Sequence, residues 1–365
     1  MSLSLPSTFS DRLTSYKQLI EADIAAYAAD IRKTTAGQYG RYVAEVETDV
    51  FLDMLERGGK RIRGALVMVG YEMAGGTNRP MIIEAARAIE MLHTYILMID
   101  DIQDRSKLRR GKPTAHEMLT DYHQRHNLKG DAAHAGMSLA LMSAIAGGHA
   151  AQVVLANLDA DPDARLKALS ISNRTMVITA HGQTLDIMNE LVAAPSAEDV
   201  ERVLEWKTAL YTIINPLHVG MVLACASCEF TDAITPYGLH AGKAFQITDD
   251  ILGIYGDEAA LGKTPGDDIR EGKGTLLVLY ALEHARPEDR QILQACLGKQ
   301  DLTDNDLAQC RSIIKSCGAL AHARKEAHTH TQAALAALES NKDMWSDTGM
   351  GFLRDLTLAL QDRVN

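Results

Sequence analysis

The sequence has few of the residues that stabilise small secreted proteins or bind nucleic acids. It contains five cysteines among 365 residues, an odd number that does not suggest a disulfide framework, so we expect a reducing, cytoplasmic location. Its formal net charge of -11 argues against a nucleic acid as partner. The N-terminus is polar and lacks the apolar segment of a signal peptide. With 46% hydrophobic residues, the chain is predicted to be a soluble protein with a large core.

Two groups of potential metal ligands lack the residues that would complete a metal site. Cys225 and Cys228 form a CxxC pair without a second pair or a histidine cluster, so we expect two buried thiols on a helix. His322, His328 and His330 lie in a polar helical stretch, for which a solvated helix face is the simpler interpretation.

Two stretches without Asp, Glu, Lys or Arg raise the question of a membrane span, residues 132–158 and 208–228. The first is rich in Ala and Gly, and the second contains Asn215 and Pro216, whereas spanning helices are more uniformly rich in Leu, Ile and Val. We expect both to be helices buried at the centre of a bundle, and the protein not to be an integral membrane protein.

Helical periodicity extends over nearly the whole chain. Apolar residues recur at spacings of three and four, and alternating β-branched runs are scarce. Three long helices are predicted, from residue 81 to about 105, from a cap at Ser196 towards residue 216, and from just after Pro236 to about residue 256. No low-complexity linker or repeat divides the sequence. We therefore predict an all-α fold in a single domain, residues 1–365.

Two aspartate clusters, about 150 residues apart, end apolar helical runs. The first comprises Asp100, Asp101 and Asp104, and the second Asp249 and Asp250. Asp100 and Asp104 are four residues apart, so their like charges share one helix face and require a cation. Carboxylates without His or Cys suit a hard ion, usually Mg²⁺ bound to substrate phosphates. The clusters predict a trinuclear magnesium–diphosphate site.

A basic, glycine-rich segment near residue 60 is a candidate for a second anion site. Lys60, Arg63 and Arg110 would bind a diphosphate without metal, because guanidinium groups bind phosphate oxygens bidentately and lysine adds a point charge. Gly58 and Gly59 would let the backbone approach the phosphates. Without the other motifs, a basic turn of this kind would be interpreted as solvated surface. A second diphosphate is needed only in a two-substrate reaction, so this pocket bears on the reaction type.

Polar residues also occur within apolar helical segments. His93 is seven residues before Asp100 and therefore shares its helix face. Lys207 and Thr208 lie in an otherwise uncharged segment, where a lysine needs an anionic partner such as a diphosphate oxygen.

Two glutamine–aspartate pairs repeat one spacing. Gln183 and Asp186 are three residues apart, as are Gln246 and Asp249. Each pair lies on one helix face, and mutual hydrogen bonding in the core is the alternative to a role in substrate binding.

These motifs together resemble those of the trans-type isoprenyl diphosphate synthases, or polyprenyl synthetases, over residues 50 to about 280. The matching segments are, in order, Gly58–Arg63, His93, Asp100–Arg110, Gly182–Asp186, Lys207–Thr208, Phe245–Asp250 and a loop with Lys263, Asp268 and Lys273. The resemblance implies a helical bundle around a central active-site cavity, the isoprenoid synthase fold. It also implies a homodimer that condenses isopentenyl diphosphate with an allylic diphosphate.

The resemblance further implies a role for each motif. The metal ligands for three Mg²⁺ ions would be Asp100, Asp101, Asp104 and Asp249. The residues in contact with the diphosphate substrates would be Gly59, Lys60, Arg63, His93, Arg109, Arg110, Gln183, Asp186, Asp250, Lys263 and Lys273. The backbone carbonyl of Lys207 and the side-chain oxygens of Thr208 and Gln246 would face the allylic cation that forms on ionisation.

The second aspartate cluster departs from the family pattern. Gly253 stands where many relatives have an aspartate, which puts the third carboxylate of this cluster in doubt. Asp257, seven residues after Asp250, is predicted to compensate through water. Asp249 is expected to be the main metal ligand there.

The residues just before the first cluster form the floor of the hydrocarbon pocket in relatives. Here these are Tyr95 and Ile96, and a single aromatic residue suggests a short-chain product. Geranylgeranyl diphosphate is the first expectation, with farnesyl diphosphate and longer chains as alternatives.

Other protein classes fit the sequence less well. A class I terpene cyclase would not need Lys60, Arg63 and Arg110, and an aromatic content of 5% is low for its cavity. A non-catalytic subunit of a heteromeric synthase would be expected to have lost acidic ligands. A di-iron bundle would need Glu-x-x-His pairs on facing helices, and the sequence offers no matching set of them.

Overall fold

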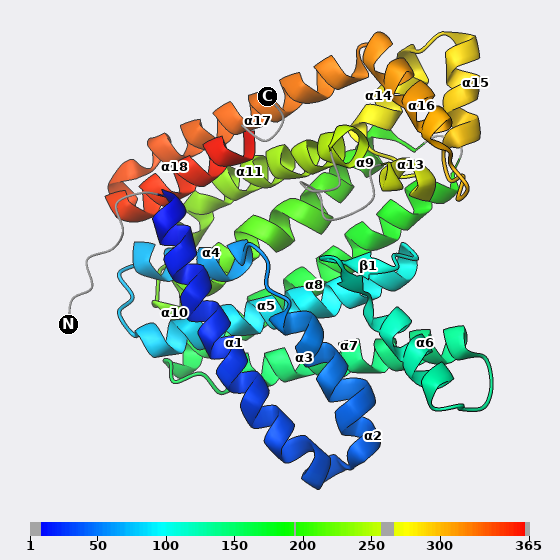
Figure 1. The fold of residues 1–365 in the computed structure, drawn as a ribbon. Helices are drawn as coiled ribbons and strands as arrows, with labels where there is room; N and C mark the ends of the chain where they lie inside the picture. The colour runs from blue at the N-terminus through cyan, green and yellow to red at the C-terminus, as the bar shows by residue number, and fades with distance from the viewer. Residues whose placement is uncertain (1–8, 193–194, 257–265, 362–365) are drawn as a thin grey trace. The chain divides into compact units, whose positions relative to one another are not determined.

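The computed structural model describes residues 9–192, 195–256 and 266–361, and these are almost entirely helical (Figure 1). Within this described part, the one sheet is a hairpin of two short strands, β1 Leu108–Arg109 paired antiparallel with β2 Lys112–Pro113. The all-α prediction is therefore confirmed. Two compact units are formed, residues 1–170 with 216–226 and residues 171–215 with 227–365.

The first unit contains the helices that carry the first aspartate cluster. They are α1 Phe9–Tyr39, α2 Arg41–Val43, the π-helix η1 Ala44–Thr48, α3 Asp49–Glu56, α4 Ile62–Met73, α5 Arg79–Gln103, α6 Ala115–Arg125, α7 Ala132–Ala156, the start of α8 Pro162–Leu191, and most of α10 Asn215–Leu223. Helix α5 packs against α1, α4 and α7 (Figure 1). Close contact between α4 and α10 depends on glycine, because a Cβ on Gly70 or Gly220 would overlap the backbone of the facing helix.

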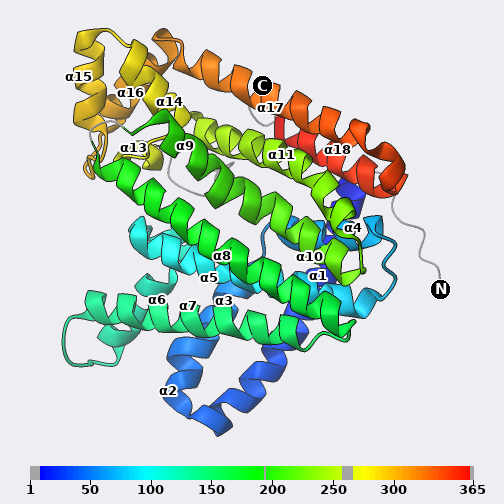
Figure 2. The same ribbon diagram turned by 180° about the vertical axis from the view of Figure 1, so that it is seen from behind.

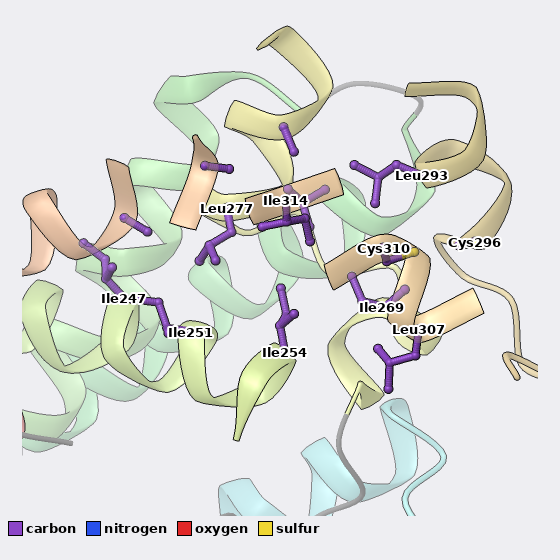
Figure 3. Close-up of a cluster of buried hydrophobic side chains, with 14 of the residues drawn as sticks. Ile247, Ile251, Ile254, Ile269, Leu277, Leu293, Cys296, Leu307, Cys310 and Ile314 are labelled. Carbon is purple, nitrogen blue, oxygen red and sulfur yellow. The ribbon is translucent and has the colours of Figure 1, made fainter. Parts of the chain in front are cut away.

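The second unit contains the rest of α8 and the helices that carry the second cluster. They are α9 Ala197–Val203, the π-helix η2 Leu204–Ile214, α11 Cys228–Tyr255, α13 Asp267–Glu271, α14 Leu276–His284, α15 Pro287–Cys296, α16 Asp304–Ser316, α17 Ala319–Ser340, the 3₁₀ turn η3 Lys342–Met344 and α18 Asp347–Gln361. Helix α11 packs against η2 on one side and α17 on another (Figure 2). Its apolar face, including Ile247, Ile251 and Ile254, enters a core shared with α13 to α16 (Figure 3).

Helix α7 corresponds to the first uncharged stretch and is buried only on one side. It packs against α5 and α6 within the first unit, and it is the one described helix long and apolar enough to cross a membrane. Apolar side chains on its other side are exposed: Met137, Leu141, Met142, Ile145 and Val153. Burial at the centre of a bundle was expected, but α7 is buried only where it faces α5, α6, α3 and η1.

The predicted helix boundaries agree with the structure at most ends. Ser196 caps α9 through its hydroxyl, which accepts a hydrogen bond from the Asp199 amide at 3.0 Å. The prediction that a helix starts after Pro236 is wrong, because α11 begins at Cys228, capped by Ser227, and accommodates the exposed proline.

The two CxxC thiols and the histidine series also differ from expectation. Cys225 lies in a turn with φ of 60°, Cys228 is the first residue of α11, and both are exposed, so they are not buried thiols on a helix. On α17, His328 is exposed, but the ring of His322 stacks on Tyr280 with centroids 4.4 Å apart. A solvated face therefore describes only part of this series.

Candidate active site

A left-handed turn between α3 and α4 creates the basic segment of the first unit. Gly58 and Gly59 have φ of 80° and 132°, values that strain any residue with a side chain. Arg61 follows with φ of 52° and is the N-cap of α4. Lys60 lies exposed at the tip of this turn, and the side chain of Arg63 starts from the first turn of α4.

Arg61 and Glu90 hold this turn in place, a role that the sequence did not reveal. Both side chains are buried, and Arg61 Nη1 lies 3.3 Å from Glu90 Oε2. Arg61 Nη2 also donates to the Leu55 carbonyl at 2.7 Å, and the Gly64 amide donates to Glu90 Oε1 at 2.9 Å. The turn is thus attached to α5 through a buried charged pair. A glutamate in the apolar part of α5 was the available signal, because a buried carboxylate needs a partner.

Guanidinium groups converge on His93 of α5. Arg63 Nη1 lies 3.2 Å from His93 Nε2, so the ring accepts this hydrogen bond as a neutral imidazole. Burial lowers the pKa of His93 well below its usual value, and the charges of Arg63, Arg110, Arg109 and Arg61 lower it further. The ring is therefore surrounded by cations, and this part of the unit favours an anion.

Arg110 reaches the turn from the β1–β2 hairpin. It has φ of 55° and precedes Gly111 with φ of 72°, the pair of positive values that a tight hairpin turn requires. Its guanidinium contacts the Gly58 carbonyl and occupies the space beside Gly59, where a Cβ would lie 2.8 Å from Nη2. Burial and then the charge of Arg61 lower the pKa of Arg110. Gly59 is therefore required both for its backbone conformation and for the room it leaves to Arg110.

The first aspartate cluster forms the C-terminal turn of α5. Asp100 and Asp101 belong to the last turn, and Asp104 is the C-cap. Negative side chains are unfavourable at this end of a helix, whose dipole already presents partial negative charge. The cluster therefore needs cations.

Asp101 and Arg109, expected to bind metal and diphosphate respectively, are paired with each other. Arg109 Nε donates to Asp101 Oδ1 at 2.8 Å, and the Asp101 side chain is fully buried. Arg109 Nη2 also lies 3.9 Å from Asp100 Oδ2. Burial lowers the pKa of Arg109, but the negative charge of Asp101 and its hydrogen bond raise the pKa by more. The pKa of Arg109 is therefore raised. Asp100 and Asp104 remain the two carboxylates on the shared helix face.

The side chain at the floor position lies against a glycine of α7. A Cβ on Gly148 would be 2.9 Å from Tyr95 Cγ, so the ring fills the space beside this glycine. The adjacent Gly147 faces the ring of Phe51 in the same way. Phe51 and Met91, the latter one turn before Tyr95 on α5, line a cavity of about 620 Å³ between α1, α3 and α7.

In the second unit, two lysines meet the carboxylates of α8. Lys207 Nζ donates to Asp186 Oδ2 at 2.5 Å. Lys273 Nζ donates to Glu190 Oε1 at 2.6 Å and lies 3.7 Å from both Asp186 and Glu271. Gly182 makes this arrangement possible, since a Cβ there would lie 2.7 Å from the Lys207 amide nitrogen. The mid-chain Gly-Gln-x-x-Asp motif thus brings α8 close to η2.

A chain of side-chain hydrogen bonds leads from η2 to the second aspartate cluster. Thr208 Oγ1 donates to Gln246 Oε1 at 2.6 Å, and Gln246 Nε2 donates to Asp250 Oδ1 at 2.7 Å. Thr208 is therefore connected to Asp250 of the second cluster through Gln246. Burial raises the pKa of Asp250 well above its usual value, and the nearby Asp268 raises it further. This excess of buried negative charge would be relieved by a cation.

Asp268 belongs to a motif that the sequence revealed, but the sequence assigned it no role in the site. A Cβ on Gly253 would overlap the carboxylate of Asp268, which comes from α13. Asp268 therefore occupies the space of the side chain that Gly253 lacks. The available signal was the glycine itself, together with an aspartate in the first turn of the next described helix. Asp257, predicted to compensate, and Lys263 lie outside the described residues.

The carboxylates of both units suit a hard divalent ion rather than a closed protein cage. Within residues 9–192, 195–256 and 266–361, no three His, Cys, Asp or Glu side chains are grouped to hold a metal ion by themselves. Mg²⁺ commonly takes only one or two protein carboxylates and completes its shell with waters and substrate phosphates. The oxygen-only donors Asp100, Asp104 and Asp249 fit that chemistry.

Known proteins resemble this chain along nearly its whole length. A family model described as polyprenyl synthetase matches residues 45–314. The geranylgeranyl diphosphate synthase of Saccharolobus solfataricus is 35% identical over 258 residues, covering 71% of this chain and 73% of that protein. A short chain isoprenyl diphosphate synthase of Methanothermobacter thermautotrophicus is 29% identical over 349 residues, 95% of this chain and 97% of that one.

A solved structure is similar to this chain in fold and in sequence. Geranylgeranyl pyrophosphate synthase from Corynebacterium glutamicum, complexed with isoprenyl diphosphate and magnesium, superimposes with a TM-score of 0.90. It is 31% identical, and the match covers 96% of this chain and 99% of that chain.

Proposed function

The chain belongs to the polyprenyl synthetase family of prenyltransferases, as its motifs predicted, and we propose that it condenses isopentenyl diphosphate with an allylic diphosphate. The product is a short all-trans prenyl diphosphate, with geranylgeranyl diphosphate as the first choice. The names of the Saccharolobus and Corynebacterium relatives support this product class.

The convergence of four arginines on a neutral His93 is the observation that carries the proposal. Arg61 forms an ion pair with Glu90 and Arg109 with Asp101, and the charges of these arginines act on His93 together with those of Arg63 and Arg110. A diphosphate bound there would need no metal, because guanidiniums supply bidentate donors. Lys60, Gly59 and His93 would complete the contacts to isopentenyl diphosphate.

The allylic diphosphate is assigned to the carboxylates. Asp100 and Asp104 on α5 and Asp249 on α11 would hold three Mg²⁺ ions, which neutralise the charge that develops on the leaving diphosphate. Asp101 would orient Arg109 rather than bind metal directly, and Lys207, Lys273 and Arg109 would contact diphosphate oxygens.

The side chains near η2 would stabilise the allylic cation after the C–O bond breaks. Thr208 and Gln246 present oxygens in a fixed chain of hydrogen bonds, so little reorganisation is needed when charge appears. The double bond of isopentenyl diphosphate then attacks the cation, and the released pyrophosphate accepts the proton. Most of the rate enhancement comes from orientation and fixed electrostatics.

The exposed apolar side of α7 supports a homodimer. Met137, Leu141 and Ile145 recur at helical spacing on that side, so a second copy of the helix would bury a continuous apolar face. Burial of this face is also the simplest reason why an apolar helix belongs to a cytoplasmic protein. Residues 1–365 would then form one catalytic domain per subunit.

Turnover with purified protein tests the assignment. Isopentenyl diphosphate, an allylic diphosphate and Mg²⁺ should together yield a longer prenyl diphosphate and pyrophosphate. Consumption of the allylic substrate without isopentenyl diphosphate, giving a hydrocarbon, would instead identify a cyclase. No turnover with any allylic substrate would contradict the proposal.

A further inference from the structure

Two histidines on packed helices of the second unit lie outside every role described above. His240 is on α11 and His330 on α17, and their Nδ1 atoms are 2.9 Å apart. The ring centroids are 5.2 Å apart, the planes are tilted by 34°, and both side chains are partly buried. Two imidazoles from different helices therefore direct the same type of nitrogen at one point.

The surroundings keep both rings neutral, which is the form that binds metal ions. Burial lowers the pKa of His240, and the charge of Lys243 lowers it further. Burial lowers the pKa of His330 as well, followed by the effects of His240 and Lys243. One Nδ1 must donate its hydrogen and the other must accept it with its lone pair, so a single hydrogen lies between the two nitrogens.

Carboxylates offset the nearby lysine. Glu201 forms an ion pair with Lys243, and Glu205 lies 3.7 Å from the same ammonium group. Glu326 is four residues before His330 on α17, so it shares that helix face, and its charge acts on the His330 ring. The local charge therefore does not exclude a divalent cation.

We propose that His240 and His330 bind a divalent transition metal such as Zn²⁺ or Co²⁺ through their Nδ1 atoms. Zinc–nitrogen bonds of about 2.0–2.1 Å in tetrahedral geometry place two ligand nitrogens roughly 3.3 Å apart. The observed separation needs to open by only a few tenths of an ångström. The donor ring moves its proton to Nε2, so the two rings together release no proton.

The site would be of modest affinity and selective for borderline metals. Within the described residues no third His, Cys, Asp or Glu is grouped with the pair, so water completes the shell and Glu326 acts through water. Mg²⁺ prefers oxygen ligands and would not compete. The metal would join α11 to α17, which form the most extensively packed helix pair of the unit (Figure 2).

The test uses full-length protein without a tag and with Cys225→Ser and Cys228→Ser, because these exposed thiols could also bind metal. Titration with Co²⁺ followed by visible absorption, and thermal melting with Zn²⁺, measure binding. We expect saturable binding and a higher melting temperature. His240→Ala or His330→Ala should weaken affinity at least tenfold, whereas His322→Ala, on the same helix but outside the pair, should have no effect.

Folding is monitored by circular dichroism and by turnover with Mg²⁺, which none of these residues serves. If an alanine variant does not fold, His330→Gln is used instead, since it preserves a hydrogen bond to His240 but is a poor metal ligand. Equal affinity in the parent and in a folded pair variant would overturn the proposal. Absence of binding in the parent would also overturn it. A melting temperature that responds to protonation of the pair but not to metal would identify a hydrogen-bonded contact only.

Discussion

The carboxylate of Asp268 fills the space into which a side chain on Gly253 would project. The two residues are 15 positions apart, and Asp268 lies on α13 rather than on α11. A negative group is thereby returned to the second cluster from another helix. Asp268 also contributes to the raised pKa of Asp250, which places its charge close to that cluster.

Asp268→Asn should therefore raise the Mg²⁺ concentration needed for half-maximal turnover by at least tenfold. The neighbouring Asp267→Asn is the matched control, because Asp267 pairs with Arg270 at 2.9 Å and not with the cluster. The swap variant Gly253→Asp with Asp268→Gly should recover part of the loss, since it restores a carboxylate from the α11 side. Equal Mg²⁺ dependence in wild type and Asp268→Asn would show that Asp268 has no role in metal binding.

Asp100→Asn should mainly lower activity, whereas Asp101→Asn should mainly lower folding stability. Asp100 is a proposed metal ligand, so its loss should cost about 3–4 kcal/mol of transition-state stabilisation with little change in melting temperature. Asp101 is fully buried against Arg109, and breaking such a pair costs roughly 3–5 kcal/mol of folding stability because a buried charge is left behind. Turnover and thermal melting of both variants make the comparison. Similar melting temperatures for the two would contradict the structural role of Asp101.

Arg63→Ala should raise the KM for isopentenyl diphosphate more than the KM for the allylic substrate. Loss of a charge-assisted contact is worth about 1.5–3 kcal/mol, so an effect of tenfold or more is expected. Lys60→Ala should act in the same direction. Lys112→Ala, an exposed lysine of the β2 strand, serves as the control for a general loss of charge. Equal changes in the KM for isopentenyl diphosphate and in the KM for the allylic substrate would contradict the assignment of this pocket to isopentenyl diphosphate.

Tyr95→Ala should lengthen the product by at least one isoprene unit. The ring fills the space beside Gly148, and a cavity lined by Phe51 and Met91 lies one helical turn further along α5. Tyr95→Phe keeps the ring and should leave the product unchanged. Mass spectrometry of the dephosphorylated products reports the length. An unchanged product with stability lower by roughly 3–5 kcal/mol would mean that Tyr95 is only a packing residue.

Acid should destabilise the protein partly through His93. Burial and then the arginine charges hold its pKa below the usual value in the folded state, so the unfolded chain takes up a proton first as the pH falls. The free energy of unfolding should therefore decrease below about pH 6.5, the ordinary pKa of histidine. His93→Gln should lose less stability than wild type between pH 7.5 and 5.5, as measured by denaturant titration at each pH. An equal decrease in the free energy of unfolding for wild type and for His93→Gln would contradict a contribution from His93.

Local sequence patterns predicted the helices and the motif residues, but not the partners that these residues choose. The end of α5 followed from periodicity, and the cap of α9 from Ser196. By contrast, Asp101 pairs with Arg109, eight residues later in the chain, because the β1–β2 hairpin places Arg109 beside the end of α5. The assignment of the start of α11 to Pro236 failed because an exposed proline is tolerated within a long, well-packed helix. Long-range partners such as Glu90 for Arg61 or His240 for His330 are set by helix packing, which no local spacing encodes.

The crowding of guanidiniums around His93 has a practical consequence for handling the protein. Small oxyanions in the buffer should bind to the guanidinium donors proposed for a diphosphate, because these groups pair with phosphate and sulfate oxygens in the same bidentate way. Inorganic phosphate and sulfate would then raise the melting temperature and compete with isopentenyl diphosphate for the same donors. Apparent affinities measured in phosphate buffer would be too weak, and crystals grown from sulfate would present the pocket already filled.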